Sequence, residues 1–115
     1  MVRQERDLAI EELDKNNILS IQDIQKNCNE PVWEASLLLH LLERGSGFGY
    51  VLKYKNSCIG YILLRSLVDE IEVLSLGVLE PNRRQGIASK LFYKFEESIA
   101  KKNIKRIILE VKVEN

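Results

Sequence analysis

Residues 76–88, LGVLEPNRRQGIA, form the stretch that decides the fold. Its apolar start is typical of the end of a β-strand, and its polar, positively charged middle indicates a loop. Gly86 then opens a predicted amphipathic helix that reaches about Lys102. The apolar positions that mark this helix are Ile87, Leu91, Phe92, Phe95 and Ile99. The stretch therefore predicts a strand, a loop and a helix in succession.

Another strand is predicted after this helix, over residues 104–113 (IKRIILEVKV). Its uninterrupted apolar run, Ile107–Leu109, favours a central position in a sheet, covered on both faces. A strand, a helix and a second strand in this order form a right-handed crossover between parallel strands. We therefore expect a parallel β–loop–α–β unit in the C-terminal half.

The N-terminal part is predicted to hold a short strand at 8–10, a helix after Asp14 and a second helix over 33–44. Gly45 is a natural left-handed cap for the second helix. The inward residues of the first helix are predicted to be Ile18, Ile21 and Ile24, and those of the second Ala35, Leu38, Leu39 and Leu42.

Between the two parts, strands are predicted at 48–54 and 58–64, joined by a short hairpin link at 55–57. A third strand is predicted at 71–78, and its alternation breaks near residues 74–75. The break fits a β-bulge, and it also fits a fully buried strand. Together the elements predict an α/β domain with a mixed central sheet whose N-terminal strands are antiparallel.

The composition is that of a single soluble domain. The chain has 115 residues, of which 45% are hydrophobic and 30% charged, and this excludes disorder and low-complexity arrays. No apolar run is long enough for a membrane span and the N-terminus is unlike a secretory signal, so we expect a cytoplasmic protein. Cys28, Cys58 and His40 lack the spacing of a zinc site, which argues against metal chemistry.

Charge is unevenly divided, although the formal net charge is zero: residues 1–82 hold 8 Lys and Arg against 13 Asp and Glu, and residues 83–115 hold 9 against 4. The basic part begins at the loop before Gly86. Amides at a helix N-terminus have no internal partners and carry the positive end of the helix dipole, so they bind phosphate. Arg83 and Arg84 add positive charge, and Gly86 permits close approach of a pyrophosphate. Because no Walker A or GxGxxG motif occurs, the residues alone also fit a basic turn with a convenient glycine.

The segment Arg83–Ala88, RRQGIA, fits the [QR]-x-x-G-x-[GA] signature of the Gcn5-related N-acetyltransferase (GNAT) superfamily, which this chain resembles. The resemblance implies the GNAT fold and a site for acetyl-CoA. It places the pyrophosphate of acetyl-CoA on the amides of the loop and the helix start. It places the acetyl-pantetheine arm along the preceding strand, which is bulged and splayed in this family. The implied cofactor-binding residues are Leu76, Gly77, Val78, Arg83, Arg84, Gln85, Gly86, Ile87, Ala88, Ser89 and Asn115.

Within the superfamily, residues 69–78, 81–88 and 107–111 resemble the bacterial enzymes that acetylate the N-terminal alanine of a small-subunit ribosomal protein. The resemblance implies an N-acetyltransferase that moves an acetyl group from acetyl-CoA to a primary amine without a metal ion. The expected acceptor is a peptide or protein N-terminal α-amine, and neither nucleic acid nor a membrane is an expected partner.

Glu110 is the candidate catalytic residue. It is the only charge within residues 107–111, so its carboxylate is expected on one face of an otherwise apolar strand. Burial there would raise its pKa toward the range of a general base, and the resemblance implies this role. The residues also fit a solvent-facing glutamate, or one paired with Lys112 or Arg106.

Other interpretations stay open at this point. The chain also fits a non-catalytic acyl-CoA-binding module that keeps the fold. A nucleic-acid binder using the basic residues 83–106 is disfavoured, because Phe92, Tyr93 and Phe95 lie at helical core spacing and not on a stacking platform. The acidic residues of 69–72 either attract a cationic peptide N-terminus or are ordinary surface charges.

GNAT domains continue past the position of Asn115 with a helix and two strands, and that helix carries a tyrosine that protonates the departing thiolate. We expect the 115-residue chain to be a C-terminally incomplete single domain that lacks these elements. We further expect weaker cofactor binding, low activity and self-association through the open edge of the sheet.

Overall fold

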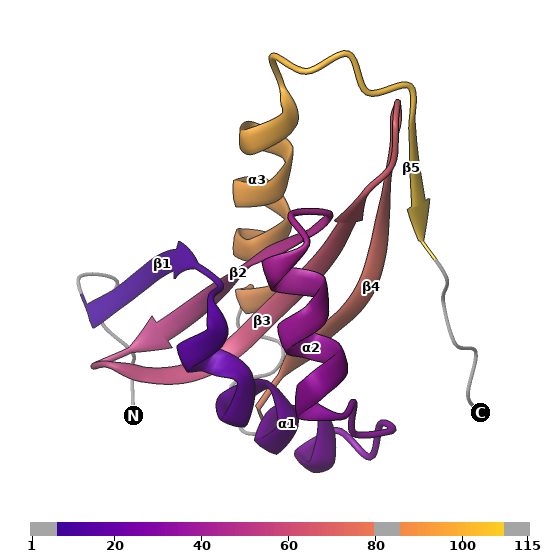
Figure 1. The fold of residues 1–115 in the computed structure, drawn as a ribbon. Coiled ribbons are helices and arrows are strands. Elements are labelled where there is room, and N and C mark those ends of the chain that lie inside the picture. The colour runs from indigo at the N-terminus through magenta and orange to yellow at the C-terminus, as the bar shows by residue number, and fades with distance from the viewer. Residues whose placement is uncertain (1–6, 80–85, 110–115) are drawn as a thin grey trace.

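The structure, a computed structural model, describes residues 7–79 and 86–109. A five-stranded sheet carries helices on both faces (Figure 1). In chain order the elements are β1 (Leu8–Glu12), the 3-10 turn η2 (Lys15–Asn17), α1 (Ile18–Asn27), α2 (Ala35–Glu43), β2 (Gly47–Tyr54), β3 (Ser57–Ser66), β4 (Glu70–Val78), α3 (Ile87–Ile99) and β5 (Arg106–Leu109). Each helix and strand predicted from the sequence has its counterpart here.

The strands lie in the sheet in chain order, β1-β2-β3-β4-β5. Neighbours from β1 to β4 are antiparallel, and β5 runs parallel to β4. α3 makes the crossover between these two parallel strands, so β4, α3 and β5 form the predicted unit. The α/β class and the mixed sheet are therefore confirmed.

The core consists of two apolar layers, one on each face of the sheet (Figure 1). One face, here called the α3 face, is covered by α3, and the other, the α1/α2 face, is covered by α1 and α2. Successive strand residues alternate between the faces, as a pleated sheet requires. The buried residues of α3 are Ile87, Leu91, Phe95 and Ile99, and they pack on Leu52, Ile62 and Leu64 of the strands. Ile21, Ile24 and Leu38 pack on Val51, Tyr61 and Leu63.

Local sequence explains several element boundaries. The Asp14 side chain accepts a hydrogen bond from a backbone N–H in the first turn at 2.8 Å, and the Asn17 side chain accepts one from the Asp14 N–H at 2.8 Å. This reciprocal cap starts η2 and α1. Gly45 follows α2 with a φ of +78°. Lys55 and Asn56 both have positive φ, as a type I′ turn between β2 and β3 requires.

β4 contains a bulge at the predicted break in alternation. Leu63 pairs with Ser75 while Leu64 pairs with Val73, which leaves Leu74 as an extra residue on β4. Leu74 packs with the core of the α1/α2 face, and Ser75 lies on the same face because its partner Leu63 does. A bulge of this kind places two consecutive side chains on one side of a strand and bends it.

Two predictions about exposure are wrong. Ala35, predicted to face inward, is exposed, because α2 packs inward from Leu38 onward, with Leu41 directly against Gly47, and its first turn stands clear of the core. The apolar run of β5 lies at the edge of the described sheet instead of the centre, with Ile107 45% and Leu109 50% exposed. These side chains are uncovered because α3 packs mainly over β2, β3 and β4. The self-association expected through this edge stays a prediction.

Candidate functional site

A cavity of about 510 Å³ opens where β4 ends and α3 begins. It is lined by every predicted cofactor-site residue that lies within the described ranges. These residues are Leu76, Gly77, Val78, Gly86, Ile87, Ala88 and Ser89. The other predicted site residues, Arg83, Arg84, Gln85, Glu110 and Asn115, lie outside the described residues. The fold thus brings together a strand end and a helix start that the sequence separates by a loop.

The start of α3 is suited to bind an anion. Gly86 precedes the helix in the left-handed conformation, with a φ of +76°, and its carbonyl accepts the first helical hydrogen bond from the Lys90 N–H at 3.0 Å. A Cβ on Gly86 would meet no atom within 4 Å, so the approach to the backbone is open. The first turn contains no acidic residue, so no side chain there offsets the positive end of the helix dipole. A phosphate group fits this position.

A further wall of the cavity comes from the end of α1 and the segment after it. Cys28 and Glu30 line the cavity there, and the Cys28 Sγ donates a hydrogen bond to the Val78 carbonyl oxygen at 3.6 Å. Neither residue was assigned to the site from the sequence, because the contact joins α1 to the far end of β4. Only a correct prediction of how α1 packs on β4 would have pointed to them.

Because residue 77 is glycine, side chains of α1 and β3 can lie close against the backbone of β4 where β4 lines the cavity. A Cβ at Gly77 would lie 2.8 Å from Ile24 Cγ2 and 2.8 Å from Tyr61 Cε1, which is closer than real Cβ contacts. Glycine is therefore required at this position by space. The described pairing of β4 with β5 extends over Glu70–Val73, upstream of the residues that line the cavity.

A family model described as the acetyltransferase (GNAT) family matches residues 18–115. The matched range covers most of the chain and includes both the end of β4 and the start of α3. This chain belongs to the GNAT family. The GNAT fold expected from the RRQGIA segment is therefore confirmed, and the cavity lies at the strand end and helix start where that segment predicted a cofactor.

Known GNAT relatives agree with this assignment. The N-alpha-acetyltransferase of Saccharolobus solfataricus is 38% identical over 89 residues, which are 66% of this chain and 53% of that protein. The chain therefore spans about half the length of this curated relative. The crystal structure of Ard1 from Thermoplasma volcanium has 25% identity and a TM-score of 0.83, covering 95% of this chain and 74% of that one.

The ribosomal-protein-S18-alanine N-acetyltransferase from Escherichia coli has a TM-score of 0.84 with 16% identity, covering 94% of this GNAT chain and 69% of that one. At this identity the likeness shows a shared fold alone.

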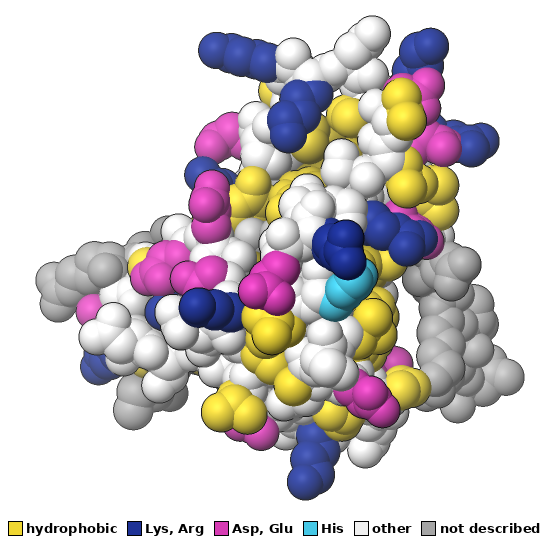
Figure 2. Space-filling view, in the orientation of Figure 1, with side chains coloured by type: hydrophobic (Ala, Val, Ile, Leu, Met, Phe, Trp, Pro, Cys, Tyr) yellow, Lys and Arg dark blue, Asp and Glu magenta, His cyan; other side chains and the backbone are white. Residues whose placement is uncertain are grey.

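The acidic residues near the start of β4 in this GNAT chain are paired with cations. The ion pairs are Glu72 with Arg65 at 2.5 Å, Asp69 with Lys105 at 3.8 Å, and Glu70 with Arg106. Figure 2, which views the α1/α2 face, shows Lys and Arg side chains interspersed with Asp and Glu. The arrangement supports the interpretation of these acidic residues as ordinary surface charges, because each is already balanced.

A buried polar cluster lies on the α1/α2 face beside the cavity. Tyr61 is 1% exposed, and its hydroxyl makes a hydrogen bond with the hydroxyl of Ser75. Burial raises the pKa of the Tyr61 phenol above its ordinary value, and the side chains of Ser75 and Gln25 lower it only in part. No sequence pattern pointed to this cluster, since its members come from α1, β3 and β4.

Residues 7–79 and 86–109 contain neither a metal-binding cluster nor a membrane-spanning helix. No group of three or more His, Cys, Asp or Glu side chains is placed there to hold a metal ion. Nor does any helix in these ranges combine the length and apolar character that crossing a membrane requires.

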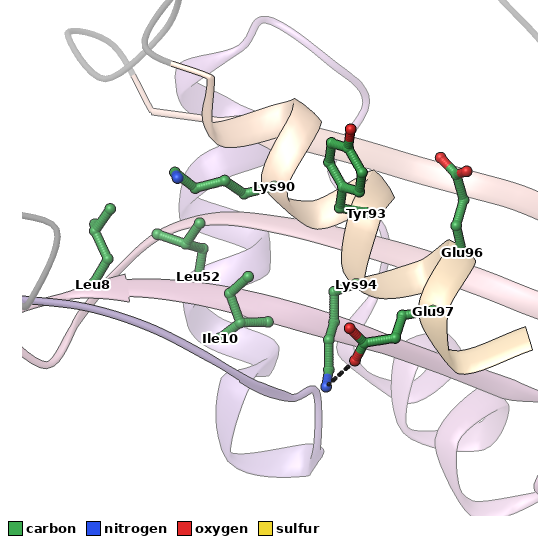
Figure 3. Close-up of a pocket in the computed structure, with 8 residues that line it drawn as sticks. All are labelled: Leu8, Ile10, Leu52, Lys90, Tyr93, Lys94, Glu96 and Glu97. Atoms are coloured by element: carbon green, nitrogen blue, oxygen red, sulfur yellow. Dashed lines mark hydrogen bonds and ion pairs between the residues drawn. The ribbon is translucent and has the colours of Figure 1, made fainter. Parts of the chain in front are cut away.

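A second cavity, of about 570 Å³, lies between β1 and α3 (Figure 3). Leu8, Ile10 and Leu52 form an apolar floor, and the residues on the other side come from the middle of α3. Lys94 Nζ there pairs with Glu97 Oε1 at 3.4 Å. This cavity is somewhat larger than the first, but it lacks an open helix start. The chemistry of the lining, and not the volume, therefore selects the cavity at Gly86 as the candidate site.

Proposed function

We propose that this GNAT chain transfers an acetyl group from acetyl-CoA to a primary amine, and that the amine is a protein N-terminal α-amine. Membership of the acetyltransferase family supports acetyl transfer. The 38% identity to an N-alpha-acetyltransferase supports an α-amine as acceptor. The motif resemblance of residues 69–78, 81–88 and 107–111 supports the N-terminal alanine of a ribosomal protein as one such acceptor.

One observation carries the proposal: the end of β4 and the start of α3 line the same cavity of about 510 Å³. The open backbone at Gly86 and the absence of acidic residues in the first turn of α3 fit a pyrophosphate. The strand that leads to the cavity carries the bulge at Leu74, which fits the family's route for the pantetheine arm.

In this proposal, the amides of residues 84–89 hold the pyrophosphate, and Arg83 and Arg84 add positive charge. The strand segment Leu76–Val78 lies along the acetyl-pantetheine arm, and Asn115 contacts the donor. Backbone N–H groups of the strand hold the oxyanion that develops on the thioester carbonyl.

Glu110 is proposed as the general base. Its carboxylate takes a proton from the acceptor ammonium, directly or through water, and so provides a neutral amine. The amine nitrogen then bonds to the thioester carbon and gives up its remaining extra proton to solvent, the C–S bond breaks, and coenzyme A leaves as a thiol after its sulfur takes up a proton from solvent. No covalent bond to the protein forms, so neither Cys28 nor Cys58 is required as a nucleophile.

The cofactor site is tested by Gly86→Val with Gly45→Val as the matched control. A side chain in the left-handed region costs about 1–2 kcal/mol, so the helix start should shift and the affinity for coenzyme A should fall about tenfold. Gly45 has nearly the same φ, +78° against +76°, and equally open space around its Cβ. It lies far from the cavity, so isothermal titration of Gly45→Val should give the wild-type affinity. Undiminished affinity in Gly86→Val would contradict the assignment.

Catalysis is tested with acetyl-CoA and an alanine-starting peptide, whose acetylation is followed by mass spectrometry. Glu110→Gln should keep the affinity for coenzyme A and lower kcat about 10²–10⁴-fold, because a general base is lost. Normal turnover by this variant would place the base elsewhere. Binding of coenzyme A by the wild-type chain without acetylation of any peptide would favour the non-catalytic acyl-CoA-binding alternative.

A further inference from the structure

Two hydroxyl groups, one on buried Tyr61 and one on half-buried Ser75, meet beside the strand segment that lines the candidate cavity. Tyr61 on β3 is 1% exposed, and its hydroxyl is hydrogen-bonded to the hydroxyl of Ser75 on β4. Ser75 immediately precedes Leu76, the first strand residue that lines the cavity. The pair therefore joins β3 to β4 at the point where β4 enters the candidate site.

The bulge on β4 creates this contact. Because Leu74 is the extra residue, Ser75 pairs with Leu63 and not with Leu64, and its side chain is turned toward the α1/α2 face. Tyr61 lies on β3 two residues before Leu63, on the same face, where it is paired with Gly77, and its side chain reaches the Ser75 hydroxyl from there. Without the bulge, residue 75 would be shifted in register and turned to the α3 face, so the hydroxyl pair and the bulge depend on each other.

Gln25 connects the same region to the segment after α1. Its side chain is 1% exposed, its Oε1 accepts a hydrogen bond from the Trp33 N–H at 2.9 Å, and its backbone carbonyl accepts one from the Glu30 N–H at 2.9 Å. Gln25 Nε2 is buried close to the Tyr61 phenol, whose pKa the Gln25 side chain lowers, although in the described part of the chain its geometry falls short of a hydrogen bond. Buried polar groups are costly unless they are paired, so this concentration of them at one place calls for a role beyond packing.

Packing alone would be served by an apolar pair. A phenylalanine at position 61 would fill the space beside Gly77 and Ile24 equally well, and an alanine at 75 would fit the bulge. The hydroxyl–hydroxyl bond adds direction, because it ties the side chain of Ser75, which lies between Leu74 and Leu76 in the bulge, to the buried Tyr61. Backbone N–H groups that stabilise a developing charge work only when they are held in position beforehand.

We propose that Tyr61, acting through Ser75, is a positioning residue for acetyl transfer. The hydroxyl pair holds the bulged part of β4 so that the backbone groups of Leu76–Val78 face the thioester carbonyl. The inference rests on the proposed function, since it assigns these residues to the same site. It concerns the reacting carbonyl and not the pyrophosphate, which lies at the start of α3.

The test compares Tyr61→Phe, Ser75→Ala and the double variant with the wild type. For each protein, isothermal titration gives the affinity for coenzyme A, and peptide acetylation gives kcat and the KM for acetyl-CoA. Each single variant should lower kcat about three- to tenfold, the effect of one lost hydrogen bond, with the affinity for coenzyme A unchanged within twofold. The double variant should be no slower than either single variant, because both changes break the same contact.

Matched variants separate positioning from a loss of structure. Ser75→Thr keeps a hydroxyl and should recover most of kcat. Tyr93→Phe removes a hydroxyl from a side chain that is 75% exposed and does not line the candidate cavity at Gly86, so it should leave kcat unchanged. A fall in kcat that is matched by an equal loss of coenzyme A affinity would assign Tyr61 a structural role and overturn the proposal. Multiplicative effects in the double variant would overturn it as well, because the hydroxyls would then act independently.

Failure of the proposed function gives a different result. If the wild-type chain binds no coenzyme A, the donor site itself is wrong, and the inference falls with it. If the wild-type chain acetylates the peptide and Tyr61→Phe has the same kcat, the proposed function stands and only the role of Tyr61 is refuted.

Discussion

The two faces of the sheet are built differently. On the α3 face a single helix contributes four buried apolar residues, Ile87, Leu91, Phe95 and Ile99, and the buried cluster there is apolar except for the Tyr50 hydroxyl. On the α1/α2 face the buried residues include Gln25 and Asn17, and Tyr61 is hydrogen-bonded to Ser75. Tyr61, Ser75 and Gln25 gather near the bulge of β4 and the candidate cavity, whereas Asn17 lies in the cap at the start of α1.

The glycines of the sheet follow the same division. Three glycines lie on the α1/α2 face of the strands: Gly47, Gly49 and Gly77. A Cβ on any of them would lie under 3.0 Å from another atom. Gly60 faces α3, where its Cβ would lie 3.0 Å from a methyl group of Ile87. The α1/α2 face thus achieves close approach by omitting side chains, whereas the α3 face fills its space with them. Of these glycines Gly77 brings backbone to the candidate cavity, and the filled α3 face is expected to provide stability.

The largest expected effect tests the α3 face as the source of stability. Phe95→Ala removes a ring that is 1% exposed and lies 6.4 Å, between centroids, from the Phe92 ring. It should lower the free energy of unfolding by about 3–5 kcal/mol, measured by denaturant titration. Tyr93→Ala on the same helix removes a side chain that is 75% exposed and should change it by less than about 0.5 kcal/mol. Equal effects would mean that α3 does not pack as described.

The glycine contrast is tested by Gly49→Ala against Gly60→Ala. The new Cβ at Gly49 would lie 2.1 Å from the Ile62 carbonyl oxygen, a backbone atom that cannot move without disturbing β3. We expect a loss of about 1–3 kcal/mol or more in unfolding free energy. At Gly60 the new Cβ would press on the Ile87 methyl group at 3.0 Å, which can give way. Denaturant midpoints that are equally lowered by both changes would remove the distinction between the faces.

The smallest expected effect is a pH dependence of the free energy of unfolding that comes from the Tyr61 phenol on the α1/α2 face. Burial raises the folded-state pKa of Tyr61 above its ordinary value of 10.0, so the folded chain holds this proton at a pH where the unfolded chain has lost it. The associated stability is fully present below pH 10.0 and is lost as pH rises toward the folded-state pKa, with a slope of at most about 1.4 kcal/mol per pH unit.

Tyr61→Phe should lack this slope, and Tyr93→Phe should retain it. Thermal or denaturant unfolding between neutral pH and pH 11 measures the difference between the variants, with the titration of the lysines common to all. If the unfolding free energies of the wild type and Tyr61→Phe change in parallel with pH, the phenol ionises equally easily in the folded and the unfolded chain.

Much of the fold was predictable because it depends on local patterns. The periodicity of Ile18, Ile21 and Ile24 marked α1, and the glycine at 45 marked the end of α2. The broken alternation near Leu74 fitted the bulge that the structure shows, although it also fitted a fully buried strand. Each of these signals lies within a few residues of the feature that it predicts. The residues of β4 and α3 that line the cavity were named by the GNAT resemblance of RRQGIA, and the local pattern added only that a strand end and a helix start lie close in sequence.

The incorrect or missing predictions depend on distant contacts. Ala35 has the right helical spacing to face inward, but its exposure is decided by where α2 crosses the sheet. Cys28 and Glu30 enter the cavity only because α1 packs on β4. The hydroxyl pair of Tyr61 and Ser75 requires the register of β3 on β4 after the bulge, and no pattern within either strand reveals that register.

The strands of the sheet have the same order in space as in the chain, and this has a consequence during synthesis. A chain that leaves the ribosome N-terminus first can complete the β2–β3–β4 meander, residues 47–78, while α3 is still unmade. The two-residue turn at Lys55 and Asn56 makes closure of the first hairpin cheap in chain entropy. Leu52, Ile62 and Leu64 then stay bare until the helix is translated. We expect the nascent chain to need a chaperone most in this interval, and least once residue 99 has emerged.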